Sequence, residues 1–226
     1  MNRRGCWYVT LVVVVGLTLC SGVVAGEALV DLDPDVDLDG NGTESDPYEI
    51  ENSSELQAMA GNLSANYTLV ADIDASNTSA WNSGAGFKPI GNATDRFIGS
   101  FNGSDQTVSE LYINRSTEDN IGLFGYTTGA LIERVSLDGV DIDGDTRVGG
   151  LIGTNVGSNV TGANTNGSVV GTVRVGGLVG NNAGSSNVTE SFASGSVVGS
   201  SDYVGGLVGY NSLGTVIRSY ATSEVD

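Results

Sequence analysis

The hexapeptide VGGLVG occurs at residues 175–180 and again at 204–209, and a near copy, VGGLIG, occupies residues 148–153. Glycines this dense either cradle a phosphate or allow backbones to approach closely in a repetitive fold. A dinucleotide-binding loop has glycines at its first, third and sixth positions, and a helix follows it. Here two glycines are adjacent, no amphipathic helix pattern follows, and the motif recurs. The recurrence favours a fold of stacked repeats.

A second landmark recurs in step with the glycine motif. With an earlier copy, IGLFG, the second motif glycine falls at Gly122, Gly150, Gly177 and Gly206, at spacings of 28, 27 and 29 residues. The segments LIERVSLDG, NVTGANTNG, NVTESFASG and TVIRSYATS follow at matching distances. A period of about 28 residues with short β-branched segments predicts an all-β fold built of β-solenoid or β-helix-like repeats.

The repeat predicts which side chains stack from coil to coil and why glycine recurs. Glycine is needed in a coil where φ is positive or where stacked backbones come close. Two apolar ladders are expected. They consist of Leu123, Leu151, Leu178 and Leu207, and of Phe124, Ile152, Val179 and Val208.

The composition changes along the chain and divides it into four segments. Residues 1–25 have the pattern of a targeting segment, and residues 26–47 are acidic with Gly and Pro, which predicts an extended lead-in. Residues 48–119 predict a strand-rich N-terminal capping module that leads into the solenoid. The repeats fill residues 120–226, and the last repeat is incomplete.

One short helix is expected in the N-terminal module. Ser53 or Ser54 is a candidate N-cap, and Leu56, Met59 and Ala60 form the apolar face. The segment NYTLVADID, which follows, predicts a strand.

The repeat motif resembles a known family. Its copies GLFG, GLIG, GLVG and GLVG look like the GLUG motif, named for Gly-Leu-hydrophobic-Gly, and the preceding stretches FKPIG and FIGSFNG are similar to what comes before such repeats. The resemblance covers residues 40–226. It assigns as motif positions Gly122, Leu123, Gly125, Gly150, Leu151, Gly153, Gly177, Leu178, Gly180, Gly206, Leu207 and Gly209.

The resemblance implies a β-helix-like segment of a secreted or surface protein, with no catalytic residue in the motif. One setting of the family is a bacterial metallopeptidase that acts on immunoglobulin A through a histidine-glutamate zinc motif. This chain contains no histidine. The resemblance therefore implies a scaffold and leaves the activity open.

The N-terminal segment predicts export. Arg3 and Arg4 precede an uncharged run from Gly5 to Gly26, and small residues near Ala25 permit cleavage. We interpret residues 1–25 as a signal peptide. An uncleaved anchor is the alternative, because the 22 uncharged residues are enough to span a bilayer. Either reading places the rest of the chain in the extracellular space or on the cell surface.

The composition excludes several kinds of chemistry. Both cysteines, Cys6 and Cys20, lie in the targeting segment, and histidine is absent. The rest of the chain therefore lacks thiol nucleophiles, serine-histidine triads and typical zinc sites. No cofactor is expected, apart from the calcium considered below.

The charge balance bears on partners and on source. After residue 25 there are 27 acidic and seven basic residues, so the field of the protein repels nucleic acid and anionic lipid. Acidic excess with a single lysine is typical of proteins that work in multimolar salt and indicates a haloarchaeal source. An ordinary acidic surface protein is the alternative.

An acidic stretch at residues 35–46 fits part of a twelve-residue calcium loop. Asp35, Asp37 and Asp39 occupy its first, third and fifth positions, and Asp46 occupies the twelfth, where glutamate is usual. No flanking helices are expected to hold the loop in shape. We interpret the stretch as a solvated acidic linker, with weak calcium binding as the alternative.

Asn-x-Ser/Thr sequons are frequent in this chain. Sequons accept N-glycans in translocated proteins, whereas the same residue types are also common in turns. We expect several of the eleven to carry glycans. They are Asn41, Asn52, Asn62, Asn66, Asn77, Asn92, Asn102, Asn114, Asn159, Asn166 and Asn187.

Paired carboxylates raise the question of catalysis. Asp72 and Asp74, or Asp141 and Asp143, are two residues apart, which places them on one face of a strand at about 6.6 Å. That separation falls within the range of glycosidase pairs, but it is common in an aspartate-rich chain.

The sequence predicts a non-catalytic extracellular or cell-surface repeat module with a structural or adhesive role in the cell envelope. A carbohydrate-active β-helix enzyme or a polysaccharide-binding module is the alternative.

The expected partners are a protein or a glycan of the cell envelope or extracellular space. The last repeat reaches Asp226 without a polar capping segment, and the edge of a solenoid exposes unpaired strands. This predicts either a truncated reading frame or end-to-end self-association through the C-terminal edge.

Overall fold

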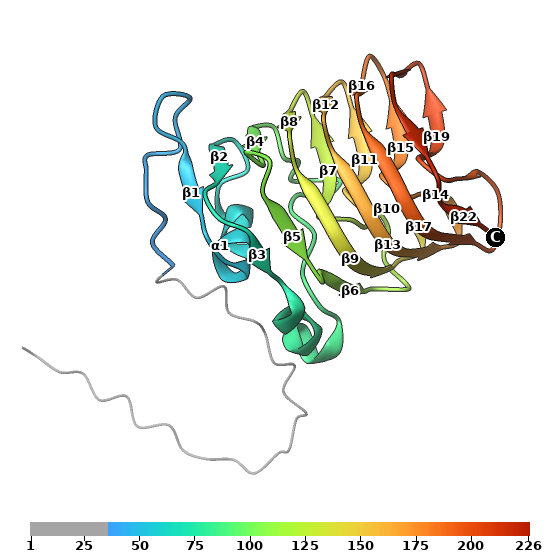
Figure 1. Cartoon of the computed structure of the whole chain (residues 1–226), viewed down its shortest axis with the longest axis horizontal. Coiled ribbons are helices and arrows are strands. Elements are labelled where there is room, and N and C mark those ends of the chain that lie inside the picture. The colour runs from blue at the N-terminus through green and yellow to red at the C-terminus, as the bar shows by residue number, and fades with distance from the viewer. Residues whose placement is uncertain (1–35) are drawn as a thin grey trace, which may run out of the picture.

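The computed structural model describes residues 36–226, which form a stack of strand-built coils (Figure 1). The expected targeting segment at residues 1–25 lies outside the described residues. Within residues 36–226, every pairing between named strands is parallel. The strands form four sheets that run along the stack.

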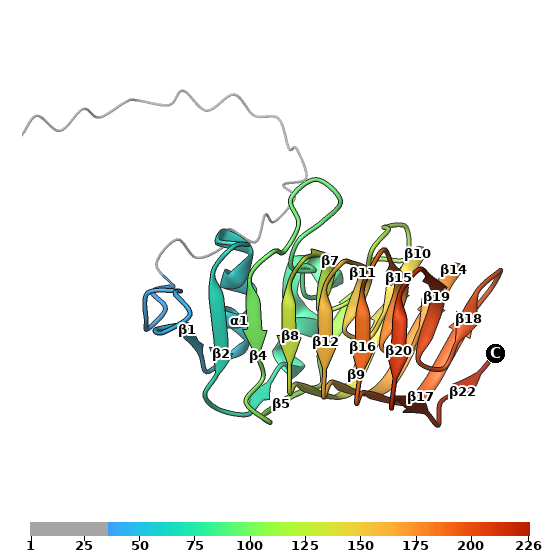
Figure 2. The ribbon, with the colours of Figure 1, turned by 90° about the horizontal axis from the view of Figure 1, so that it is seen from above.

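Sheets I and II are the longer ones, and Figure 2 shows the strands of sheet I side by side. Sheet I contains, in spatial order, β1 (Tyr48–Ile50), β2 (Asn66–Leu69), β4 (Ser100–Asn102), β8 (Leu131–Glu133), β12 (Asn159–Thr161), β16 (Asn187–Thr189) and β20 (Thr215–Ile217). Sheet II contains β3 (Ile73–Asp74), β5 (Thr107–Ser109), β6 (Tyr112–Asn114), β9 (Ser136–Asp143), β13 (Asn164–Gly171), β17 (Phe192–Gly199), β21 (Tyr220–Ala221) and β22 (Glu224–Val225).

Sheets III and IV are confined to the repeats and close each coil. Sheet III contains β7 (Phe124–Thr128), β11 (Ile152–Val156), β15 (Val179–Ala183) and β19 (Val208–Ser212). Sheet IV contains β10 (Thr146–Gly149), β14 (Val173–Gly176) and β18 (Val204–Gly205). One coil therefore takes a strand from each sheet, as β11, β12, β13 and β14 do in succession.

The register confirms the predicted solenoid and its period. Phe124 pairs with Ile152, Ile152 with Val179, and Val179 with Val208, so the second expected ladder is present. In the leucine ladder, Leu123, Leu151 and Leu178 are fully buried, and Leu207 is partly buried. These ladders form the apolar interior of the repeats.

The motif glycines are explained by the close approach of neighbouring backbones. A Cβ atom on Gly180 would lie 2.6 Å from the backbone nitrogen of Val148, and one on Gly177 would lie 2.3 Å from the carbonyl oxygen of Gly206. Positive φ values belong to other corner glycines, such as Gly184. Of the two reasons for glycine considered from the sequence, close packing applies at the motif.

The N-terminal module contains three helical elements, α1 (Ser53–Ala58) and the 3-10 helices η1 (Met59–Gly61) and η2 (Ser76–Gly84). Helix α1 packs at the end of the stack that carries β1 and β2 (Figure 1). Leu56 and Met59 are fully buried, as expected, whereas Ala60 is only partly buried. No helix within residues 36–226 is long and apolar enough to cross a bilayer.

The expected N-cap of α1 was wrong by one or two residues. Asn52 is the cap, and its Oδ1 accepts hydrogen bonds from the backbone N–H groups of Ser54 and Glu55, both at 3.0 Å. The Ser53 hydroxyl instead donates to Oδ1 of Asn77 at 3.0 Å. Since Asn and Ser are equally good caps, the tertiary contact of Ser53 decides between them.

The module and the repeats share one core. The ring of Phe97 lies 6.3 Å from that of Tyr67 and 4.9 Å from that of Phe124, and Phe101 lies 5.4 Å from Phe124. Phe124 belongs to the first repeat. The aromatic cluster therefore joins the N-terminal module to the solenoid.

Candidate functional site

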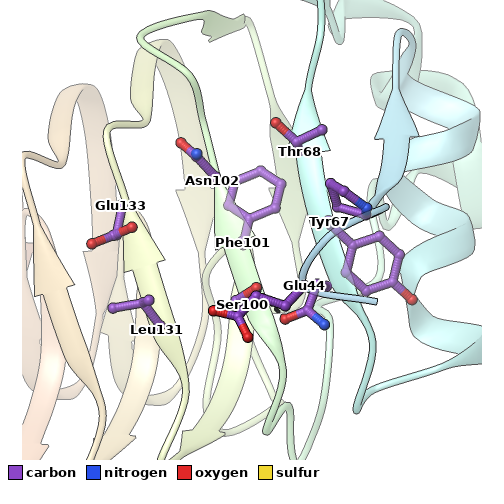
Figure 3. A pocket seen from close by; sticks show the side chains of 10 residues that line it. Glu44, Tyr67, Thr68, Ser100, Phe101, Asn102, Leu131 and Glu133 are labelled. Carbon is purple, nitrogen blue, oxygen red and sulfur yellow. Dashed lines mark hydrogen bonds between the residues drawn. The ribbon is translucent and has the colours of Figure 1, made fainter. Parts of the chain in front are cut away.

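A hollow of about 230 Å³ lies on the outer face of sheet I, over β2, β4 and β8 (Figure 3). Strand alternation turns Tyr67 and Phe101 into the core and the polar residues outward. The hollow also has two carboxylates, Glu44 from the lead-in and Glu133 from β8. Its full lining is Glu44, Pro47, Asn66, Tyr67, Thr68, Ser100, Phe101, Asn102, Leu131 and Glu133.

The amides of this hollow are tied to neighbouring groups. The Ser100 hydroxyl donates to Oδ1 of Asn66 at 2.6 Å, and Nδ2 of Asn66 donates to the carbonyl oxygen of Gly42 at 3.0 Å. Oδ1 of Asn102 accepts from the Arg134 guanidinium at 3.2 Å. These groups stabilise the stack and the lead-in and are therefore less available to a ligand.

A second hollow, of about 260 Å³, lies on the outer face of sheet II over β9, β13 and β17. Nδ2 of Asn166 donates to Asp138 at 2.7 Å, and the Ser194 hydroxyl donates to Asn166 at 3.2 Å. Beside this polar ladder, the rings of Phe192 and Tyr220 lie 4.6 Å apart, and Tyr220 is 63% exposed. This face therefore offers aromatic rings next to amide and hydroxyl groups.

A buried ladder of amides runs inside the solenoid and was not expected from the sequence. The Thr127 hydroxyl donates to Oδ1 of Asn155, Nδ2 of Asn155 to Oδ1 of Asn182, and Nδ2 of Asn182 to Oδ1 of Asn211, each at 2.9 Å. Asn155 and Asn182 are fully buried. A signal was present, because asparagine recurs at this position in three successive repeats.

Replacing Asn182 by alanine is expected to lower the free energy of unfolding by about 3 kcal/mol, because it leaves a buried donor on Asn155 and an acceptor on Asn211 without partners. The matched control is Asn187→Ala, which removes one half-exposed ladder bond to Asn159. It should cost about 1 kcal/mol or less. Urea unfolding followed by circular dichroism measures both, and equal losses would contradict a special role for the buried ladder.

The calcium loop suspected at residues 35–46 falls partly outside the described residues, because Asp35 is not among them. The side chain of Asp46 accepts a hydrogen bond from Nδ2 of Asn41, and its backbone pairs with Thr43 in a tight turn. Within residues 36–226, no three His, Cys, Asp or Glu side chains are grouped so as to hold a metal ion. Calcium binding by Asp35, Asp37, Asp39 and Asp46 stays a prediction.

The two carboxylate pairs considered for catalysis lie in different parts of sheet II, one beside the edge strand β3 and one in the central strand β9. Asp74 accepts hydrogen bonds from Ser76, which lower the pKa of Asp74. Burial, and then the charge of Asp141, raise the pKa of Asp143. Asp72 accepts a hydrogen bond from the backbone N–H of Thr107 at 2.8 Å. Local contacts thus account for the position of Asp72 and for both pKa shifts.

These shifts predict opposite effects of two amide substitutions on stability. The lowered pKa of Asp74 adds stability that is present above the ordinary pKa and is lost as the pH falls through the lowered value. The raised pKa of Asp143 adds stability at low pH that is lost as the pH rises through the raised value. At pH 7, Asp74→Asn should therefore lower the melting temperature and Asp143→Asn should raise it.

The difference between each variant and the wild type should shrink towards pH 3, where the carboxyl groups become protonated. Melting curves at pH 3, 5 and 7 in molar salt measure it. Shifts of the same sign at pH 7 would contradict the assignment of these two environments.

Comparison with known proteins identifies the same repeat motif that was found in the sequence. The family model described as the GLUG motif matches residues 200–226, which contain β18 to β22. Halomucin of Haloquadratum walsbyi is 46% identical over 203 residues, which cover 75% of this chain and 2% of halomucin. A protein of Evansella cellulosilytica named as a Gly-rich membrane protein is 37% identical over 131 residues, which cover 55% of this chain and 15% of that protein. The chain thus spans only a small part of either relative.

A solved structure assigned as an immunoglobulin A1 protease of Bacteroides ovatus covers 82% of this chain and 79% of its own, with 17% identity and a TM-score of 0.38. Structural similarity at this level gives no evidence of a shared activity. The sequence relatives, the matched motif and the observed coils of 27 to 29 residues agree. The chain is a GLUG-motif repeat protein.

Proposed function

We propose that this chain is a non-catalytic structural module of an extracellular or cell-surface protein, placed in the cell envelope of a halophilic archaeon. The observation that carries the proposal is the continuous coil stack, in which carboxylates and amides on the outer faces are used in coil-to-coil hydrogen bonds. Asn66, Asn102 and Asn166 are examples. The identity to a haloarchaeal protein over most of the chain supports the source and the acidic surface.

A surface location can be tested on intact cells that produce the protein. Brief protease treatment, followed by mass spectrometry of the released peptides, should yield peptides from residues 36–226 before any cytoplasmic marker appears. Protection of the chain until the cells lyse would contradict the proposed location.

The absence of catalysis needs its own assay. The purified chain in multimolar salt is incubated with extracellular polysaccharide and with a protein mixture, and reducing ends and new amino termini are measured. We expect neither to rise above the buffer control. Release of reducing ends that is lost in a variant of Glu133 would contradict the structural role and point to the hollow on sheet I.

A second candidate function, polysaccharide binding, is favoured by the hollow on sheet II. A sugar ring has an apolar face and a hydroxyl rim, which suit the Phe192 and Tyr220 rings beside the Asn166 ladder. Affinity electrophoresis in gels that contain neutral polysaccharides tests it. Retardation that is lost in the Phe192→Ser and Tyr220→Ser double variant, but kept in Leu213→Ser, would support binding. Leu213 is a suitable control because it is 89% exposed and lies outside this hollow.

A further inference from the structure

The structure divides the eleven sequons by what the asparagine amide nitrogen does. N-glycosylation forms a bond at Nδ2, so that atom and the hydroxyl residue two positions on must both be accessible to a transferase. An Nδ2 that holds two coils together is unsuitable, because glycosylation replaces one of its protons and adds a bulky group between coils. The three requirements are therefore an accessible asparagine, an Nδ2 without a hydrogen bond, and sequon side chains that make no hydrogen bond to another part of the fold.

The strand sequons fail these requirements. Nδ2 of Asn66 donates to Gly42, Nδ2 of Asn166 to Asp138, and Nδ2 of Asn187 to Oδ1 of Asn159 at 2.8 Å. Asn159 is exposed, but its Oδ1 accepts this bond from Asn187, its neighbour in the next coil. Glycosylation of Asn159 would place a bulky group beside that coil-to-coil contact.

Three further sequons, in a turn, at the cap of α1 and at the end of β6, have an engaged amide nitrogen. Nδ2 of Asn41 donates to Asp46, Nδ2 of Asn52 donates to Glu55 at 2.7 Å, and Nδ2 of Asn114 donates to the Tyr112 hydroxyl at 3.2 Å. The hydrogen bond at each Nδ2 makes these sites poor glycan acceptors in the folded chain.

In two further sequons, a side chain is hydrogen-bonded to a distant residue of the N-terminal module. At Asn102, which is half-buried, the sequon hydroxyl of Ser104 is hydrogen-bonded to Thr68 at 2.9 Å. At Asn77, Oδ1 accepts from Ser53, and the sequon hydroxyl of Ser79 donates to a backbone carbonyl at 2.8 Å. Both sites are held by the fold of the N-terminal module.

Asn62 and Asn92 meet all three requirements. Both are exposed, and among residues 36–226 no hydrogen bond involves either Nδ2. Oδ1 of Asn62 accepts from the backbone N–H and the hydroxyl of Ser64, at 3.4 and 3.0 Å. Oδ1 of Asn92 accepts from the backbone N–H groups of Thr94 and Asp95, at 2.8 and 2.9 Å. Each turn holds the amide oxygen by local hydrogen bonds and leaves the nitrogen of an exposed residue without one.

The two sites lie together on the N-terminal module. Asn62 and Asn92 both line a hollow of about 410 Å³, which also contains Lys88 and Asp95. Asn92 belongs to the loop before β4, which projects from the stack in Figure 2. A transferase can approach this loop without contacting the coils.

We propose that Asn62 and Asn92 are N-glycan acceptors and that the strand sequons are not. In the transfer, Nδ2 attacks C1 of a sugar that is activated as a polyprenyl phosphate or pyrophosphate. The bond between C1 and the phosphate oxygen breaks, the phosphate leaves with the bonding electrons, and the amide proton passes to a base of the transferase. The inference rests on the proposed export of the chain, and the test below separates the two.

The test measures the occupancy of each sequon. The full chain is produced in a halophilic host that secretes it and glycosylates its own surface protein, and glycopeptides from the medium are analysed by mass spectrometry. We expect glycan on Asn62 and Asn92 in most molecules, and on Asn66, Asn159, Asn166 and Asn187 in a small minority. Secretion without any glycan at Asn62 and Asn92 would overturn the assignment and leave the proposed location intact.

Variants of the hydroxyl position provide the matched control. Thr94→Ala should abolish the glycan on Asn92, whereas Thr94→Ser should retain it. Thr189→Ala, which removes the strand sequon of Asn187, should leave the mass of the glycoprotein unchanged apart from the substitution itself. Similar occupancy at turn and strand sequons would overturn the inference that the fold selects the acceptors.

Discussion

Replacing Gly180 by alanine is expected to lower the free energy of unfolding by about 4 kcal/mol or more, because the stacked backbones leave no room for a methyl group there. The new Cβ would lie 2.6 Å from the backbone nitrogen of Val148 and 2.7 Å from the carbonyl carbon of Arg147. Both atoms belong to the backbone of the preceding coil. That backbone is paired on both sides, so relief of the contact requires two coils to separate.

Two other glycines serve as controls that distinguish the effect of close packing from that of backbone strain. A Cβ added at Gly61 would have no heavy atom within 4 Å, and the residue has no positive φ, so Gly61→Ala should change stability by about 1 kcal/mol at most. Gly184 has φ of +66° and no Cβ contact closer than 3.6 Å, so Gly184→Ala should cost about 1 to 2 kcal/mol from backbone strain alone. Urea midpoints in molar salt rank the three variants. A cost at Gly180 no greater than that at Gly184 would contradict the packing explanation.

The repeat and its ladders were predictable because period and register carry the information. Glycine and leucine recur at spacings of 27 to 29 residues, and a parallel solenoid must place such positions above one another. The pairing of Ile152 with Val179 follows from that rule. No knowledge of the coil's cross-section was required.

The cross-section itself was not predictable, and the buried ladder shows why. Asn155 and Asn182 are followed closely by glycine, a pattern typical of exposed turns. Whether such a residue points inward depends on where each coil bends, which is set by contacts between coils. Once it points inward, it pairs with the polar side chains of the coils above and below it, Thr127 and Asn182 in the case of Asn155, so the recurrence becomes a hydrogen-bonded chain.

The candidate glycosylation sites were predictable only as sequons, and the sequence did not indicate which of them are accessible. Sequence alone does not distinguish Asn92 in a projecting turn from Asn187 in a strand, because the tripeptides have the same pattern. The difference lies in the neighbouring coil, which supplies the acceptor for Asn187. Calcium binding in the lead-in and self-association through the C-terminal edge stay predictions.

The whole fold is expected to require salt, and the ion pairs show how little of the charge is neutralised locally. Within residues 36–226 there are four salt bridges, against 23 acidic residues in the same range. Three of them join residues one repeat apart, Asp105 with Arg134, Asp119 with Arg147 and Glu190 with Arg218. Burial is the main cause of the raised pKa of Asp143, and repulsion from the charge of Asp141 adds to it.

Screening decides whether neighbouring coils repel each other. The screening length is about 10 Å at 0.1 M and about 3 Å at 1 M ionic strength, while stacked strands are about 4.8 Å apart. Repulsion between adjacent coils therefore persists in dilute buffer and is largely removed in molar salt. Each coil is held mainly by its neighbours, so the loss should spread along the stack.

We expect a β-rich circular dichroism spectrum in multimolar NaCl or KCl and its progressive loss on dialysis below a few tenths molar. Both salts should act alike, because screening depends on ionic strength. Replacing four exposed acids that make no salt bridge, by Glu110→Gln, Asp141→Asn, Asp202→Asn and Glu224→Gln, should shift the salt midpoint to lower concentration. A melting temperature that is unchanged from 0.1 to 3 M salt would contradict adaptation to high salt, because repulsion that screening does not relieve cannot be what limits the stability of the stack.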